Sequence, residues 1–178
     1  MKRVIMAILL IIAAFGIYSF NVNNQKQSDK GLSTLKADHL LLGVSNFEET
    51  IDWYQDILGF DVEVQWKVKG LDNLDLAYLS NGDFRIEIIG DKSSTQNNKQ
   101  VRDFGEHLSH QGFAHICFQV DDIDLAMHQL NKKGIETFVK AETYPLNFYK
   151  RRVAFIKDLN GNVIEFAGPI KDTRINKK

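Results

Sequence analysis

Hydrophobic and polar positions follow the same order in two regions of the chain, and each region predicts one strand, one helix and three further strands. In the first region, an apolar run over 38–44 predicts a strand. Apolar residues spaced by three and four positions over 47–58 predict one buried face of a helix. Ser45 with Glu48 three positions later predicts a capping box at its start, and Gly59 suits the left-handed conformation that ends it.

Three strands complete the first region. An Asn-Gly pair between two apolar runs predicts a hairpin between the last two strands. On the final strand Glu87 stands between Ile86 and Ile88, so its carboxylate points to the opposite face of the sheet. We expect these strands over 60–68, 74–79 and 84–89, with the hairpin turn over 80–83.

The second region repeats this plan. Asp121 or Asp122 can cap its helix, and Gly134 ends it. A loop is expected over 141–150, where Pro145 interrupts the pattern. We expect the strands over 113–120, 135–139, 152–156 and 163–167. A polar segment with a helical turn near 101–108 connects the two regions, and its histidines, His107 and His110, are expected to be exposed.

One unit of this kind leaves one face of its sheet uncovered, and two units can pair their sheets into an incomplete barrel with the helices outside. The predicted fold class is therefore α+β, made of two βαβββ modules in one domain over 35–170. The module bounds are predicted at 35–90 and 112–169, with a linker over 91–111 and a solvated tail over 171–178.

The N-terminus has a different pattern. Lys2 and Arg3 precede an uncharged apolar run over 4–20, which is typical of a signal peptide or a single membrane anchor. We expect an apolar helix over 1–20 and a flexible polar tether over 21–34. The domain is then expected to be extracytoplasmic, either membrane-anchored or secreted or periplasmic.

Composition narrows the possible partners. The formal net charge is −1, from 22 basic and 23 acidic residues, so nothing favours nucleic acid. The single cysteine, Cys117, excludes an internal disulfide framework and is expected to be a small buried apolar residue.

The two modules carry ligand-capable side chains at matching depths. His39 and His115 each stand at the head of an apolar run, and Glu87 and Glu165 each follow about 50 positions later. If the modules are related by an approximate two-fold axis, the four side chains converge. Two imidazoles and two carboxylates suit a divalent ion such as Zn²⁺, Ni²⁺, Mn²⁺ or Fe²⁺.

Four stretches of the chain form a recognisable set, namely Asp38-His39-Leu40-Leu41-Leu42, 53–60, Ala114-His115-Ile116-Cys117-Phe118 and 158–166. Together they resemble the vicinal oxygen chelate superfamily, which includes glyoxalase I, extradiol dioxygenases, fosfomycin-resistance enzymes and bleomycin-binding proteins. The last stretch is similar to the family's Asp-Pro-Asp-Gly-Asn turn, with Leu159 and Asn160 substituted.

The resemblance implies a paired βαβββ fold and places the family's metal ligands on His39, Glu87, His115 and Glu165. It implies a glyoxalase-like lyase or isomerase acting on a small oxygen-bearing substrate, in which Glu165 or Glu87 moves a proton next to a carbonyl. Glyoxalase I itself is disfavoured, because Gly43 and Asp91 replace an arginine and an asparagine that bear on glutathione binding. The metal site can form within one chain or between two swapped chains of a homodimer.

Two alternative functions stay open. One is a non-catalytic protein that binds a small molecule such as an antibiotic. The other is a dioxygenase, which is disfavoured because only Tyr149 suits a role in oxygen activation. A basic run over 150–152 can attract an anionic substrate or simply begin a solvated strand.

Overall fold

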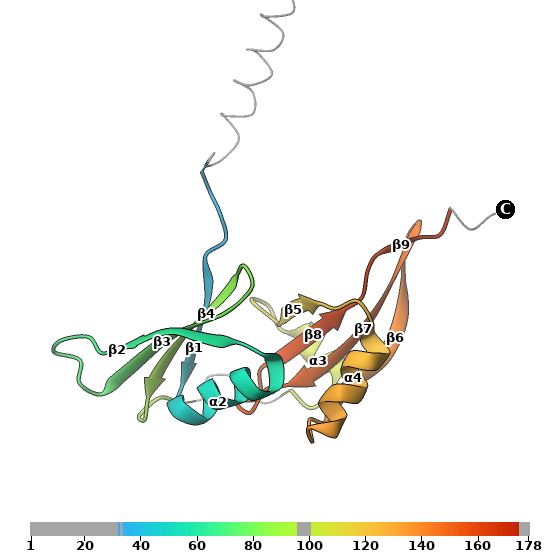
Figure 1. The fold of residues 1–178 in the computed structure, drawn as a ribbon. Coiled ribbons are helices and arrows are strands. Elements are labelled where there is room, and N and C mark those ends of the chain that lie inside the picture. Colours follow the sequence, from blue (N-terminus) through green and yellow to red (C-terminus); the bar gives the residue numbers. More distant parts are fainter. Residues whose placement is uncertain (1–31, 33, 96–100, 175–178) are drawn as a thin grey trace, which may run out of the picture. The chain divides into compact units, whose positions relative to one another are not determined.

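A computed structural model describes residues 32, 34–95 and 101–174 (Figure 1). The signal peptide or anchor expected over 1–20 lies outside the described residues, as does nearly all of the tether over 21–34. Among the residues that are described, no helix has the length and apolar character needed to cross a bilayer. The chain divides into two units, Met1–Asp38 and His39–Lys178, and the description below concerns His39–Lys178.

The first module has the predicted order of elements. It contains β1 (His39–Val44), α2 (Phe47–Leu58), β2 (Asp61–Trp66), β3 (Leu74–Asn81) and β4 (Phe84–Asp91). The strands lie in the order β1-β4-β3-β2, with β1 parallel to β4 and the other neighbours antiparallel. Because β1 and β4 are parallel neighbours, the chain must cross over between them, and α2 begins this crossover connection.

Helix α2 begins one residue later than the capping box predicted. Its N-cap is Asn46, not Ser45, and the Thr50 hydroxyl donates to the Asn46 carbonyl oxygen at 2.8 Å. Gly59 ends the helix with φ 70°, as predicted.

Alternation along the strands separates two faces of this sheet. One face packs under α2, and its buried side chains include Val44, Leu79, Ile86 and Ile88. The opposite face carries Glu87, because successive side chains on β4 point to opposite sides.

The second module repeats the arrangement with more strand. It contains β5 (Ile116–Gln119), α4 (Ile123–Lys132), β6 (Thr137–Leu146), β7 (Tyr149–Lys157), β8 (Val163–Ala167) and β9 (Lys171–Asp172). The order is β5-β8-β7-β6, with β5 parallel to β8 and β9 added beside β7. Figure 1 shows α4 against this sheet, as α2 lies against the first.

The loop expected over 141–150 is instead a long hairpin. Strand β6 reaches Leu146, β7 begins at Tyr149, and Asn147 turns the chain with φ 60°. Pro145 is tolerated because β6 is the last strand of its sheet, where a missing N–H breaks no ladder.

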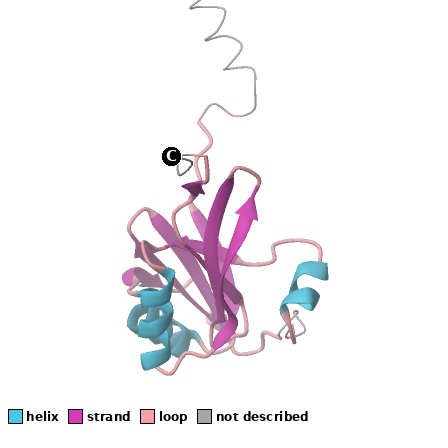
Figure 2. Cartoon of the chain, turned by 90° about the vertical axis from the view of Figure 1, so that its right-hand side faces the viewer, coloured by secondary structure: helices cyan, strands magenta, loops and turns pink. Residues whose placement is uncertain are grey.

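The linker contributes a helix that packs on the second sheet. Helix α3 (Phe104–Ser109) is capped by Asp103, whose carboxylate accepts from the Glu106 N–H at 2.9 Å. Val101 and Phe104 pack against Phe155 of β7. In Figure 2 this short helix lies on the other side of the strands from the two longer helices.

The modules meet through buried polar contacts as well as apolar ones. The Tyr54 hydroxyl on α2 donates to Asp158 in the β7–β8 turn at 3.0 Å. The Asn160 amide in the same turn donates to the Thr50 hydroxyl at 3.1 Å, and the ring of Phe60 packs edge-on against Phe118. The β7–β8 turn is therefore tied to the first module.

Candidate metal centre

One candidate half-site lies on the first sheet. His39 is the first residue of β1, and its Nε2 lies 3.1 Å from Glu87 Oε2 on β4. The two side chains are partly exposed, at 30% and 13%. The Tyr78 ring lies beside the imidazole, with centroids 5.6 Å apart.

The second half-site has the same construction. His115 precedes β5, and its Nε2 lies 3.0 Å from Glu165 Oε2 on β8. These side chains are also partly exposed, at 25% and 18%. The Phe155 ring stands edge-on to the His115 imidazole at 5.5 Å.

The backbone explains why both histidines reach their glutamates. In the first sheet Leu41 is the residue opposite Glu87, and in the second Cys117 is opposite Glu165. Each of these residues lies two positions after its histidine, so all share the face of the glutamate. The matched spacing in the sequence therefore reflects the same register of two parallel strand pairs.

The four side chains are brought together as two pairs. Across residues 34–95 and 101–174, no three His, Cys, Asp or Glu side chains gather closely enough to hold a metal ion. A binding site shared by His39, Glu87, His115 and Glu165 stays a prediction.

The donors in each pair fit a metal chemically. An imidazole nitrogen and a carboxylate oxygen are ligands that zinc, nickel, manganese and iron accept. In each pair they already point at one another from adjacent strands.

His107 contradicts the expectation of an exposed linker residue. It is 3% exposed, and its Nε2 lies 2.9 Å from His115 Nδ1. Burial lowers the pKa of His107, and the neighbouring His115 lowers it further. The sequence did contain an indication of this burial. His107 is three positions after Phe104, so in a helix both side chains lie on one face. His110 is exposed, as expected.

Cys117 is on the predicted face but is not buried. It is exposed and hydrogen-bonded to Glu165. Partial burial raises the pKa of the thiol to about 11, and the negative charge of Glu165 adds to this effect. The sulfur is therefore a neutral thiol at neutral pH.

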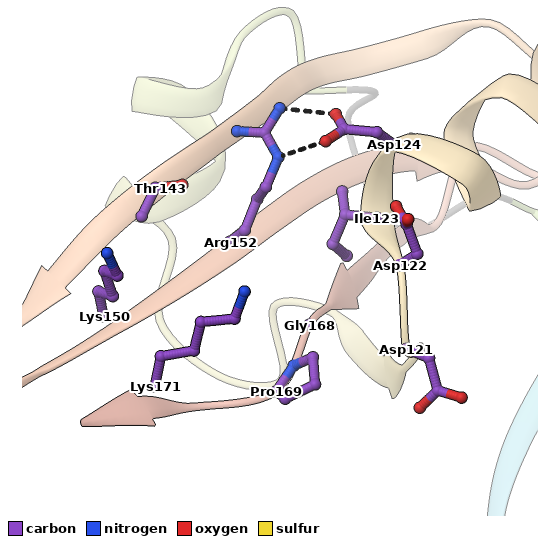
Figure 3. Close-up of a pocket in the computed structure, with 10 residues that line it drawn as sticks. All are labelled: Asp121, Asp122, Ile123, Asp124, Thr143, Lys150, Arg152, Gly168, Pro169 and Lys171. Carbon is purple, nitrogen blue, oxygen red and sulfur yellow. Dashed lines mark hydrogen bonds and ion pairs between the residues drawn. The ribbon is translucent and has the colours of Figure 1, made fainter. Parts of the chain in front are cut away.

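The basic residues 150–152 lie away from the two His–Glu pairs, in a separate pocket and in contacts with other parts of the second module. Lys150 and Arg152 line a pocket of about 330 Å³ that includes none of the four candidate ligands (Figure 3). The Arg152 guanidinium is held by Asp124 through contacts of 2.7 and 3.1 Å. Arg151 Nε donates to the Gly168 carbonyl oxygen at 2.8 Å.

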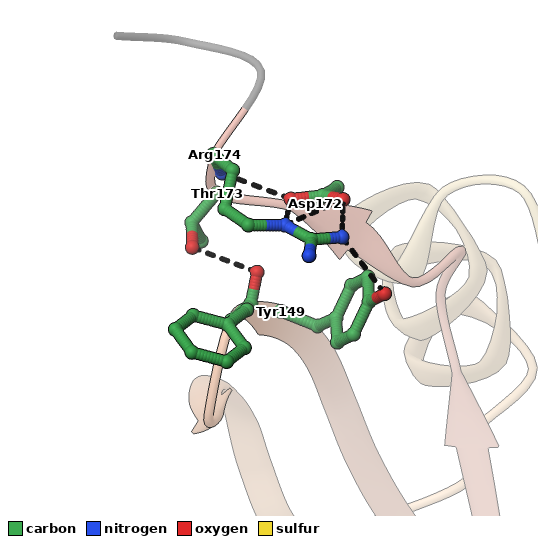
Figure 4. A network of polar contacts seen from close by, with 5 residues as sticks. Tyr149, Asp172, Thr173 and Arg174 are labelled. Atoms are coloured by element: carbon green, nitrogen blue, oxygen red, sulfur yellow. Dashed lines mark hydrogen bonds and ion pairs between the residues drawn. The ribbon is translucent and has the colours of Figure 1, made fainter.

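Tyr149 takes part in a contact with the C-terminal segment. Its hydroxyl accepts from Arg174 Nη2 at 3.1 Å, and Arg174 is also paired with Asp172 of β9 (Figure 4). The contacts of Tyr149 in the structure therefore attach the C-terminal segment to the end of the β6–β7 hairpin.

Comparison with known proteins identifies relatives of the whole folded region. A sequence model of the Glyoxalase/Bleomycin resistance protein/Dioxygenase superfamily matches residues 36–166. The Bacillus subtilis protein YraH, described as uncharacterized, is 27% identical over 74% of this chain and 96% of its own length. Lactoylglutathione lyase from Neisseria meningitidis serogroup A is 27% identical over 72% of this chain and 86% of its own. Mitochondrial methylmalonyl-CoA epimerase from Dictyostelium discoideum is 26% identical over 73% and 76%.

A solved structure supports the fold. A glyoxalase family protein from Enterococcus faecalis superimposes with a TM-score of 0.60, at 22% identity, over 75% of this chain and 98% of its own. At this identity the likeness concerns the fold alone.

Proposed function

The chain belongs to the Glyoxalase/Bleomycin resistance protein/Dioxygenase superfamily, and on that basis we propose that it is a metal-dependent lyase or isomerase. Its substrate is a small molecule with a hydroxyl or carbonyl oxygen next to a carbon that loses a proton. The observation that carries the proposal is the pair of His–Glu contacts at equivalent strand registers.

The chemistry assigns different roles to the side chains. His39 and His115 would hold a divalent ion, together with the glutamates. Such an ion supplies Lewis acidity toward a substrate oxygen. Glu165 or Glu87 takes the proton beside the carbonyl and returns it, because a carboxylate within reach of the substrate acts as a general base.

The surroundings of Gly43 and Asp91 favour a substrate other than a glutathione conjugate. Gly43 offers no side chain on the face of His39. Asp91 accepts hydrogen bonds from the Ser93 hydroxyl and N–H at 2.7 and 2.8 Å, and these bonds lower its pKa. Asp91 is thus an anion that holds the turn after β4.

We propose further that two copies of the chain complete the metal site. Each half-site supplies two donors, whereas zinc sites usually take three or four protein ligands. Leu41 and Val64 lie on the face of Glu87 and are 51% and 46% exposed. A second copy that covers this face with its own second sheet would bury both side chains and join the half-sites.

Mixed copies test this arrangement directly. His39→Ala and His115→Ala chains should each lose the metal, measured by elemental analysis of the full-length protein. Co-expressed in one cell, they should recover part of it, because a mixed dimer contains one site with both histidines intact. Metal in the wild type with no recovery in the mixture would place the site within one chain, and no metal in the wild type would end the metal proposal.

Proton exchange tests the reaction class. The metal-loaded full-length chain should exchange the hydrogen next to the carbonyl in some members of a panel of α-hydroxy and α-keto carbonyl compounds in D₂O, followed by NMR. Glu165→Gln should slow this exchange by about 10²-fold or more. Glu136→Gln, which changes an exposed glutamate between α4 and β6, is the matched control. Equal rates in both variants would remove Glu165 from the mechanism.

The second candidate is a binding protein without chemistry. It is favoured by the aromatic pair of Trp66 and Tyr78, whose ring centroids lie 4.9 Å apart beside Glu87. Tight binding of an apolar compound by protein that takes up no metal would support this function over the first.

We also propose an extracytoplasmic location. The support is the basic start at Lys2 and Arg3 followed by the apolar run over 4–20. An alkaline phosphatase fused after residue 178 should be active in bacterial cells. An inactive fusion that is present in the cytoplasm would contradict the export.

A further inference from the structure

His107 lies on α3, outside both modules. It contacts the His115 imidazole at Nδ1, whereas Glu165 contacts the same ring at Nε2. The His107 ring is stacked beside Phe104, with centroids 6.0 Å apart, and tilted against His115 at 5.2 Å. Phe104 in turn packs on Phe155, which stands edge-on to His115. The His107 imidazole is therefore fixed on two sides, and a buried polar ring of this kind needs a hydrogen-bond partner.

The two nitrogens that face each other can share only one proton. His107 Nε2 and His115 Nδ1 are 2.9 Å apart, so one donates and the other accepts. His115 Nε2 faces Glu165 at 3.0 Å, on the side where an ion would bind. A histidine that ligates through Nε2 carries its proton on Nδ1, and that proton is normally held by a neighbouring acceptor.

We propose that His107 is a positioning residue that accepts the Nδ1 proton of His115 and so keeps the Nε2 lone pair directed at the metal. This inference rests on the proposed function, because it needs His115 to be a ligand. It also makes the half-sites unequal: the sequence has no histidine between His39 and His107, so the first module has no second histidine for the same task.

Two variants of the full-length chain separate positioning from packing. His107→Leu keeps a buried apolar volume but removes the acceptor. His107→Gln retains an acceptor oxygen at a similar reach. His110→Gln, three residues further along and exposed, is the control.

Calorimetric titration with Zn²⁺ should show affinity about 10- to 100-fold weaker for His107→Leu. Binding by His107→Gln and His110→Gln should stay within a few-fold of the wild type. Equal affinity in His107→Leu and wild type would overturn the positioning role while leaving the proposed function intact. A wild type that takes up no metal would overturn both.

A second measurement does not depend on whether His107→Leu folds. Nitrogen-15 NMR of the zinc-loaded wild type should show His115 with a proton on Nδ1 and none on Nε2. A His115 ring without a proton on Nδ1 would overturn the inference, whatever affinities the titrations give.

Discussion

At the scale of single residues, the best-defined contact is the one between Tyr54 and Asp158. Both side chains are buried, at 3% and 5% exposure, and they come from different modules. Asp158 also accepts from the N–H groups of Asn160 and Asn162 at 2.9 and 2.8 Å. One carboxylate therefore organises its own turn and holds α2 of the other module.

Tyr54→Phe should lower the free energy of unfolding by about 1.5–3 kcal/mol, the usual contribution of a hydrogen bond to a charged group. The ring and its packing on Phe60 are kept, so the loss isolates the hydroxyl. Urea unfolding of the two proteins measures the difference. A stability equal to the wild type would mean that Asp158 is satisfied without Tyr54.

The same contact makes stability depend on alkaline pH. Burial raises the pKa of Tyr54 far above its ordinary value of 10, and the nearby Asp158 raises it further. Above pH 10 the unfolded chain loses the phenolic proton while the folded chain keeps it. The contribution of Tyr54 to the free energy of unfolding is therefore fully present below pH 10. Above pH 10 it falls by up to about 1.4 kcal/mol per pH unit.

The free energy of unfolding measured between about pH 8 and pH 11 should decline more steeply for the wild type than for Tyr54→Phe, since only the wild type carries this group. Parallel curves would show that Tyr54 does not set the alkaline limit.

At the scale of elements, α2 lies so close to β4 that only glycine fits at position 90. A Cβ there would lie 2.6 Å from the Cβ of Phe47, in the first turn of the helix. Rotation about the Phe47 side chain cannot relieve this contact, because Cβ is fixed by the backbone. The position of the helix on its sheet therefore depends on Gly90.

Gly90→Ala should lower the free energy of unfolding by about 1–3 kcal/mol, as overpacking does elsewhere. Gly43→Ala on neighbouring β1 is the matched control, since a Cβ there meets nothing within 4 Å. Its effect should lie within about 0.5 kcal/mol. Thermal unfolding compares the two, and equal effects would show that Phe47 can move.

The sequence predicted the helices and strands whose apolar residues are periodic. It missed the strands that form only because another strand pairs with them. The strand and helix order followed from apolar spacing, and Gly59 from its conformational freedom. The β6–β7 hairpin could not be read from 141–150, because its polar residues become strand only through pairing with each other. Likewise Lys171–Asp172 form β9 only because β7 is beside them.

The sequence predicted one site of four side chains, and the structure brings these side chains together as two His–Glu pairs. Internal repetition located His39, Glu87, His115 and Glu165, and each imidazole does contact its glutamate. His107 has no counterpart in the repeat, so comparing the modules could not find it. Its role depends on α3 docking on Phe155, a contact between distant parts of the chain.

At the scale of the whole molecule, the face of the first sheet that carries Glu87 and Leu41 is expected to bind a second copy. Val64→Lys places a charge on that face and should weaken self-association of the full-length chain by about tenfold or more, because burying an unpaired charge costs several kcal/mol. Analytical ultracentrifugation in mild detergent measures the change.

Leu125→Lys is the control for this experiment, because Leu125 is similarly exposed, at 54%, but lies on α4. A wild type that stays monomeric at all concentrations, or equal effects of both substitutions, would contradict association through this face.

The docking of α3 also bears on how this gene can change. A connector between duplicated halves is ordinarily the region most free to drift in length and composition. Here the connector delivers His107 to His115 and packs Val101 and Phe104 into the second half. Insertions and deletions should therefore be tolerated before Val101 and selected against between Val101 and His115, which would leave the second half under a constraint that the first half does not share.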